Sequence, residues 1–84
     1  MAISNNHELY SSVREIAKAL EDAGAQNLAN ELRQALTVSS MPGEVLGEVR
    51  LALQRVRSHE IYHRLNVRQH VDEGIEYVGR AFGE

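Results

Sequence analysis

The sequence predicts an all-α protein, folded as a compact four-helix bundle, and three observations support this prediction. Apolar residues recur three and four positions apart along almost the whole chain, as they do on one face of a helix. No segment shows the sustained alternation of apolar and polar residues, rich in β-branched side chains, that marks strands. With 84 residues, the chain has the length of one small domain. We therefore expect a single domain over residues 1–84, with helices at about 6–23, 26–36, 41–58 and 67–82.

The first predicted helix has signals at both of its ends. Asn5 followed three residues later by Glu8 is a capping-box pattern, in which side chains bond to free N–H groups of the first turn. Gly24 is typical of the residue that follows a helix. Between these signals, one apolar stripe is predicted to face the core and consists of Leu9, Val13, Ile16, Ala17 and Leu20.

The second and third predicted helices are separated by a break at residues 37–43. A very short turn precedes the second helix, so we expect the first two helices to pair as an antiparallel hairpin. Ser40 is a candidate cap for the third helix, and Pro42 fits its first turn, where a missing N–H costs nothing. Gly43 and Gly47 are expected to permit close contact with another helix. The apolar stripes are Leu28, Ala29, Leu32, Ala35 and Leu36, and then Val45, Leu46, Val49, Ala52, Leu53 and Val56.

The last predicted helix begins with a second capping-box pattern, formed by Asn66 and Gln69. Two glycines, Gly74 and Gly79, lie within this helix. Each should weaken it by about 1 kcal/mol relative to alanine, unless close packing requires a residue without a side chain. The predicted core stripe is Val67, Val71, Ile75, Val78 and Phe82.

Composition and charge narrow the classes of function. The chain has no cysteine, which excludes a disulfide framework, a thiolate metal site and a cysteine nucleophile. No segment approaches the roughly 18 apolar residues of a membrane span, and the N-terminus lacks the features of a secretory signal. We therefore expect a cytoplasmic protein with no membrane partner. The net charge of −3 is uneven, because residues 1–49 hold seven acidic and three basic residues, whereas residues 50–70 hold five arginines and one glutamate.

The string HEIYH is the one motif with an associated chemistry. In the H-E-x-x-H signature of zinc metalloproteases, the histidines bind the metal and the glutamate acts as general base, which assigns His59 and His63 as ligands and Glu60 as base. The stretch HEIYHRLNVRQH is similar in part to the metzincin signature H-E-x-x-H-x-x-G-x-x-H. Asn66 stands at its glycine position, however, and His70 comes one residue too late to be the third ligand. A random order of this composition contains H-E-x-x-H in about 2% of cases, so the string alone does not establish a zinc site.

The helical phase of this string limits how it can fold. If the third helix continued unbroken to residue 65, His59 and His63 would lie on its apolar stripe, while Ile61 and Leu65 would point outward. If the chain bends or forms a short helical turn at residues 59–65, the two aliphatic side chains turn inward instead. Burial of each aliphatic side chain contributes about 1.5–3 kcal/mol, whereas a buried imidazole needs a hydrogen-bond partner. We therefore expect the bend, with both histidines exposed.

The arginine-rich segment is a second candidate site. Its arginines are suited to paired hydrogen bonds with carboxylates or phosphates, as on an acidic protein or a nucleic acid. The alternative is a solvated face whose arginines form ion pairs with the acidic first two helices. Leu51 falls off the apolar stripe of its helix and, with Tyr62, is expected to mark an exposed apolar patch. The candidate partner-binding residues are Arg50, Arg55, Arg57, Arg64, Arg68, Leu51 and Tyr62.

A small helical core with no obvious substrate cavity favours binding over catalysis. We expect a non-enzymatic, bacterial-type accessory, regulatory or inhibitory protein that needs no cofactor and presents a charged helical surface to another protein, with a homodimer as a further assembly. In outline this class is similar to the small acidic helical immunity proteins, with which no motif is shared. Two other functions stay open. They are zinc binding or metal-dependent hydrolysis through the HEIYH string, and nucleic-acid binding through residues 50–68.

Overall fold

The computed structural model describes residues 3–83, and within this range it contains four α-helices, one short 3₁₀-helix and no strand. The helices are α1 (Asn6–Asp22), α2 (Gln26–Ala35), α3 (Pro42–Ser58) and α4 (Arg68–Ala81), with η1 (Glu60–Arg64) between the last two. The prediction of an all-α four-helix bundle is confirmed, and so is the short helical turn between the third and fourth helices. Each end of an α-helix lies within one residue of its predicted position.

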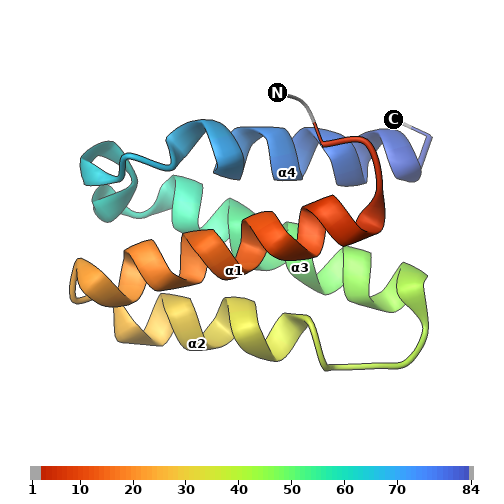
Figure 1. The fold of residues 1–84 in the computed structure, drawn as a ribbon, viewed down its shortest axis with the longest axis horizontal. Helices are drawn as coiled ribbons and strands as arrows, with labels where there is room; N and C mark the ends of the chain where they lie inside the picture. The colour runs from red at the N-terminus through yellow and green to blue at the C-terminus, as the bar shows by residue number, and fades with distance from the viewer. Residues whose placement is uncertain (1–2, 84) are drawn as a thin grey trace.

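The four α-helices form a closed ring of neighbours. Each helix packs against the next one in the chain, and α4 also packs against α1, within a body of 32 × 25 × 19 Å. The α1–α2 turn and η1 lie at one end of the bundle, whereas α1 and α3 begin and α2 and α4 end at the other (Figure 1). This topology brings residues 23–28 close to η1, although they are far apart in the sequence.

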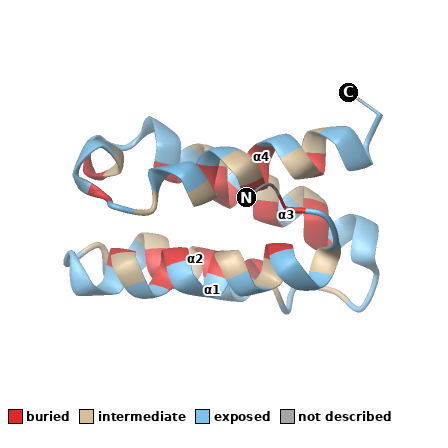
Figure 2. Ribbon diagram, turned by 45° about the horizontal axis from the view of Figure 1, so that its top comes forward, coloured by how far each residue is buried: buried red, intermediate tan, exposed pale blue. Residues whose placement is uncertain are grey.

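The core is apolar throughout the described chain. Its buried residues come from all four α-helices and from the η1 region (Figure 2) and include Ile3. None of the buried residues within 3–83 is polar or charged. The stripes predicted for the first and third helices are buried completely. Leu28, Leu36 and Val67 are only half-buried against this core. The prediction for Phe82 is wrong, because this residue lies just beyond the last turn of α4 and is 46% exposed.

Helix α1 carries the caps that its sequence predicts. The side chain of Asn5 accepts a hydrogen bond from the Glu8 N–H at 2.9 Å. The Glu8 carboxylate accepts from the backbone N–H of Ser4 at 2.9 Å and from its hydroxyl at 2.8 Å, one residue before the partner of a standard capping box. These hydrogen bonds lower the pKa of Glu8, since they favour its ionised form.

The turn after α1 depends on Gly24, whose φ of +89° lies in the left-handed region. The N–H of Ala25 bonds to the carbonyl of Leu20 at 2.8 Å, and the N–H of Gly24 bonds to the carbonyl of Glu21 at 3.0 Å. This pair of bonds is the Schellman motif, which satisfies carbonyls that the end of a helix leaves free. It reverses the chain in three residues, so α2 can return along α1.

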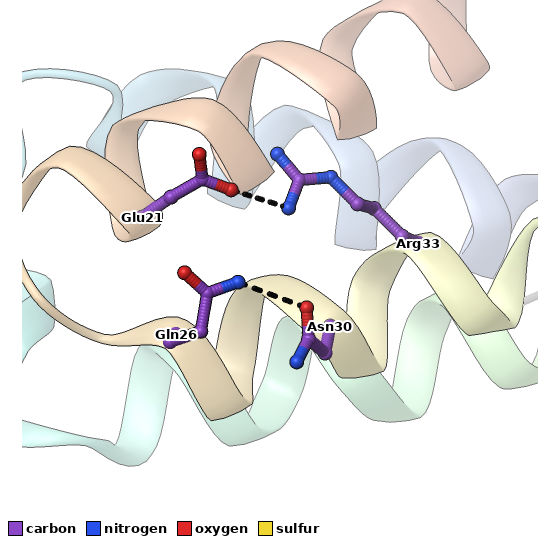
Figure 3. A network of polar contacts seen from close by, with 4 residues as sticks. All are labelled: Glu21, Gln26, Asn30 and Arg33. Atoms are coloured by element: carbon purple, nitrogen blue, oxygen red, sulfur yellow. Dashed lines mark hydrogen bonds and ion pairs between the residues drawn. The ribbon is translucent and has the colours of Figure 1, made fainter.

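One polar contact joins the two helices of the α1–α2 hairpin on its outer surface, and a second lies within α2. Arg33 of α2 donates to the carboxylate of Glu21 on α1 at 2.6 Å, and within α2 the Gln26 amide donates to Asn30 at 2.9 Å (Figure 3). The hydrogen bond and charge of Arg33 lower the pKa of Glu21. The antiparallel hairpin predicted for the first two helices is thereby confirmed.

Two predicted caps are wrong. Helix α3 has Met41 at its N-cap with no side-chain bond, and Ser39 rather than Ser40 is the nearby serine that accepts a hydrogen bond, from the Met41 N–H at 3.0 Å. Helix α4 has Val67 at its N-cap, also without a side-chain bond. Asn66 cannot cap this helix, because the chain turns at residues 66–67 before the first helical hydrogen bond forms. Pro42 does occupy the first turn of α3, as predicted.

The glycine that permits close helix contact is Gly74 rather than the predicted pair on α3. A Cβ added at Gly74 would lie 2.7 Å from Cδ1 of Leu53 and 3.5 Å from Cδ1 of Leu9. At Gly43 and Gly47, an added Cβ would meet no heavy atom of the described chain within 4 Å. These two glycines therefore face open space.

No helix in residues 3–83 is long and apolar enough to span a membrane.

Candidate functional site

The HEIYH string spans the end of one helix and the start of another. Helix α3 ends at Ser58, and His59 is extended, with φ −87° and ψ 146°, before η1 begins. Ile61 is 3% exposed and Leu65 is 4% exposed, whereas the two histidines are exposed. The predicted break is confirmed, and it places the aliphatic pair in the core.

His59 has a structural role in this break. Its Nδ1 accepts a hydrogen bond from the backbone N–H of Ile61 at 3.0 Å, so the imidazole caps η1 in the way that asparagine or serine caps an α-helix. A nitrogen that accepts this bond carries no proton and is not free for a metal. The Nε2 atom of His59 remains the one through which this side chain would bind a ligand.

The histidine pair also lacks the geometry of the zinc signature. In that signature both histidines lie on one continuous α-helix, about 40° apart around its axis, whereas here His59 is extended between α3 and η1 and His63 lies within η1. Within residues 3–83, no group of three His, Cys, Asp or Glu side chains is arranged to hold a metal ion. A catalytic zinc site needs three protein ligands and an open position. Zinc binding by His59 and His63 therefore stays a prediction without a third ligand.

Tyr62 fixes η1 to the body of the bundle. Its hydroxyl donates to the Asp72 carboxylate of α4, with contacts of 2.9 and 2.8 Å to the two oxygens. Arg57 of α3 lies 3.8 Å from Oδ1 of the same carboxylate. The ring of Tyr62 also meets the His63 ring edge-to-face, with centroids 5.5 Å apart. Tyr62 is half-buried and packs against the core, so it does not belong to an exposed apolar patch.

The Tyr62–Asp72 contact should make the protein less stable at high pH. The hydrogen bond to Asp72, with burial and the Asp72 charge, raises the pKa of Tyr62, although Arg68 and Arg57 oppose this effect. The folded state therefore holds the phenolic proton more tightly than the unfolded state does. This stabilisation is present below the ordinary tyrosine pKa and is lost as pH rises through the raised value.

Tyr62→Phe should lower the free energy of unfolding by about 0.5–1.5 kcal/mol at neutral pH, and the difference from the wild type should shrink above about pH 10. Urea unfolding of both proteins across this pH range measures it. A constant difference at all pH values would mean that the phenol–carboxylate bond makes no contribution.

The five candidate arginines differ in the contacts that they make. Arg55 lies 3.7 Å from Glu31 of α2, Arg57 lies near Asp72, and Arg68 donates to the carbonyl of His63 at 3.0 Å. Arg50 is half-buried and has a polar or charged contact of its own. Arg64 is different, because no hydrogen bond or ion pair engages its guanidinium within residues 3–83.

Arg64 lies between two surface hollows at the η1 end of the bundle. The first, of about 340 Å³, is lined by residues 23–28 of the α1–α2 turn and by His59, Ile61 and Arg64. The second, of about 520 Å³, is lined by Lys18, Ala19, Asp22, Ala23, Arg64, Leu65 and Asn66. We call these the turn hollow and the α1 hollow. Arg64 therefore contributes to the lining of both.

The turn hollow has a positive electrostatic character. Among its described lining residues Arg64 is the one charged side chain, and none is a carboxylate. The first turn of α2 also lines it, and this helix begins without a side-chain cap, so the positive end of its dipole faces the same region. The α1 hollow is more balanced, since Lys18 and Arg64 accompany Asp22. The arginine content of the sequence pointed to Arg64, but residues 23–28 reach it only through the tertiary fold.

Large apolar side chains are exposed at separate places of the described chain. Leu51 is 47% exposed on α3, as predicted from its position off the stripe. Val38 and Met41 are exposed in the α2–α3 connection, and Phe82 is exposed after α4. Of these residues, the helical pattern of the sequence assigned Leu51 alone to a candidate site.

Comparison with known proteins adds no functional information. No protein-family model, no curated protein and no solved structure matches the chain.

Proposed function

We propose that the protein is a non-enzymatic binding protein that recognises an acidic segment of another protein through the η1 end of its bundle. The observation that carries this proposal is Arg64, an arginine that has no polar partner among residues 3–83 and lines two hollows on a surface fixed by packing. An unpaired guanidinium has five donors suited to a carboxylate. The partner is accordingly expected to present aspartate or glutamate side chains.

The rigidity of the surrounding residues supports the same proposal. Ile61 and Leu65 anchor η1 in the core, His59 caps it, and Tyr62 joins it to α4. A recognition surface held in place before binding loses less conformational entropy when its partner arrives. Arg64 therefore projects from a fixed base, and its own side chain is the main part that must be ordered.

The neighbouring arginines support protein recognition rather than nucleic-acid binding. Arg57 and Arg68 on this side of the molecule already contact Asp72 and the His63 carbonyl. Binding to a nucleic-acid backbone depends on several cations that can each release counterions from phosphates. A single unengaged arginine beside a hollow suits a local carboxylate contact better than a charged polymer.

A capture experiment with two matched charge reversals tests the proposal. Immobilised wild-type protein, Arg64→Glu and Arg14→Glu are exposed to lysate of the source cells, and bound proteins are identified and purified for direct titration. Arg14 is exposed on α1 and lines neither hollow. Its reversal changes the net charge of the protein by the same amount as the reversal of Arg64, without altering the proposed site. We expect one partner whose affinity falls about tenfold or more with Arg64→Glu, stays unchanged with Arg14→Glu and weakens with salt.

Other outcomes separate the rival functions. No specific partner, or a partner that binds Arg64→Glu as well as wild type, would contradict the proposal. A strongly salt-dependent shift of DNA or RNA would favour nucleic-acid binding instead. Stoichiometric zinc that survives dialysis, and is lost in both His59→Ala and His63→Ala, would favour the metal-binding function.

A further inference from the structure

The outer face of α3 is largely exposed, although Glu48 and Arg55 at its edge also line a hollow with residues of α2. The buried residues of α3 lie on one side of the helix, and the outer face comprises Glu44, Gly47, Glu48, Leu51, Gln54 and Arg55. Leu51, near its centre, is 47% exposed. One turn earlier, a Cβ added at Gly47 would find no heavy atom of residues 3–83 within 4 Å. The face therefore presents an apolar side chain beside an unfilled space.

The protruding and the empty positions follow one ridge of the helix. Gly43, Gly47 and Leu51 are four residues apart, so they lie along the row that packs into the groove of a second helix. Two glycines lower this ridge, and Leu51 then raises it. An antiparallel helix with the same row of two glycines and a leucine fits against it, because the leucine of that helix enters the space above Gly47.

The charges of this face are also complementary to those of a second copy that runs in the opposite direction. Glu44 and Glu48 are exposed in the N-terminal half, whereas Arg55 is exposed in the C-terminal half. Arg55 is 58% exposed and lies 3.7 Å from Glu31, so its guanidinium is only partly engaged within the chain. An antiparallel copy of the helix would place acidic residues opposite Arg55. A parallel copy would place like charges opposite each other, which is unfavourable.

We propose that the outer face of α3 binds a second copy of this chain, with the two α3 helices antiparallel. Leu51 of each copy packs over Gly47 of the other, and Glu44 of each copy lies near Arg55 of the other. The arrangement has a two-fold axis, so one pair of contacts is made twice, as in most homodimers. Because the contact involves one helix face of each copy, the interface is small and the expected affinity is in the micromolar range.

Sedimentation equilibrium of the intact chain tests this proposal between about 1 μM and about 1 mM. We expect a monomer–dimer equilibrium that Leu51→Gln weakens about tenfold or more and that high salt also weakens. Met41→Gln is the matched control, since Met41 is 60% exposed in the α2–α3 connection and lies outside this face. Thermal unfolding monitored by circular dichroism establishes that each variant is folded. A monomer at every concentration, or a dimer that Leu51→Gln does not affect, would overturn the proposal.

Disulfide trapping tests the antiparallel register. The chain contains no cysteine, so introduced thiols are the only ones present. In an equimolar mixture of Leu51→Cys and Gly47→Cys chains, we expect the mixed disulfide to dominate, because the two altered positions face each other across the interface. The mixed product is identified by its mass. Dominant Leu51→Cys homodimers would show a different register and overturn the proposed contact.

This dimer is independent of the binding function assigned to the η1 end. Arg64→Glu should leave the monomer–dimer equilibrium unchanged, and Leu51→Gln should leave the turn hollow intact. Failure of either proposal can therefore be recognised without reference to the other. If both hold, the dimer carries two copies of the η1 surface.

Discussion

Replacement of Leu53 by alanine should lower the free energy of unfolding by about 3–5 kcal/mol. It should also turn Gly74→Ala, which adds a methyl group on α4, from a destabilising into a stabilising substitution. Leu53 is fully buried, and its Cδ1 atom occupies the position next to Gly74 on α4. In the wild-type background, Gly74→Ala gains helix propensity but forces a Cβ to 2.7 Å from that atom. Overpacking of this kind costs about 1–3 kcal/mol, against a gain of about 1 kcal/mol from propensity. We therefore expect Gly74→Ala to be destabilising on its own.

A double-mutant cycle measures this coupling. In the Leu53→Ala background the clash is removed, so Gly74→Ala should stabilise the protein by up to about 1 kcal/mol and fill part of the cavity. Gly47→Ala is the matched control, because its Cβ would meet no described atom within 4 Å, and it should stabilise both backgrounds. Urea unfolding at a low protein concentration gives all of these values. Equal effects of Gly74→Ala in the two backgrounds would show that Leu53 does not account for the glycine.

The fold was predictable from the sequence because amphipathic spacing determines which helix face is buried. The stripes of α1 and α3 are buried throughout, and Asn5 and Gly24 act at the ends of α1 as their residue types indicate. These signals are local, since a cap or a stripe involves residues within a few turns of each other. The predicted break after Ser58 rests on the same reasoning, because the two sides of the HEIYH string could not share one buried face.

The residue roles that escaped prediction depend on contacts between distant segments. A glycine on a helix signals either a close neighbour or open space, and only the fold distinguishes Gly74 from Gly47. In the same way, Ser39 rather than Ser40 contacts the start of α3, because the path of the α2–α3 connection decides which hydroxyl comes near. The turn hollow is a third case, since residues 23–28 and Arg64 meet only after the hairpin and η1 have packed.

Substitutions in the HEIYH string should differ in effect according to which side chains are structural. Ile61→Ala should lower the free energy of unfolding by about 2–4 kcal/mol, because it removes most of a side chain that is 3% exposed. His63→Ala should change it by less than about 0.5 kcal/mol, since an exposed residue outside caps and core contributes little. His59→Ala should cost about 1 kcal/mol through loss of the bond from the Ile61 N–H.

A matched variant separates capping by His59 from any other role of its imidazole. His59→Asn supplies a side-chain oxygen that can accept the same N–H, so it should restore most of the stability that His59→Ala loses. A ligand role would give the opposite pattern, because neither variant would bind zinc and added zinc would stabilise the wild type alone. Thermal and urea unfolding of the four variants, with and without zinc, distinguishes these cases. If Ile61→Ala were the mildest change, the aliphatic side of the string could not be the buried one. The histidines would then have to face the core, as they would if α3 continued unbroken to residue 65.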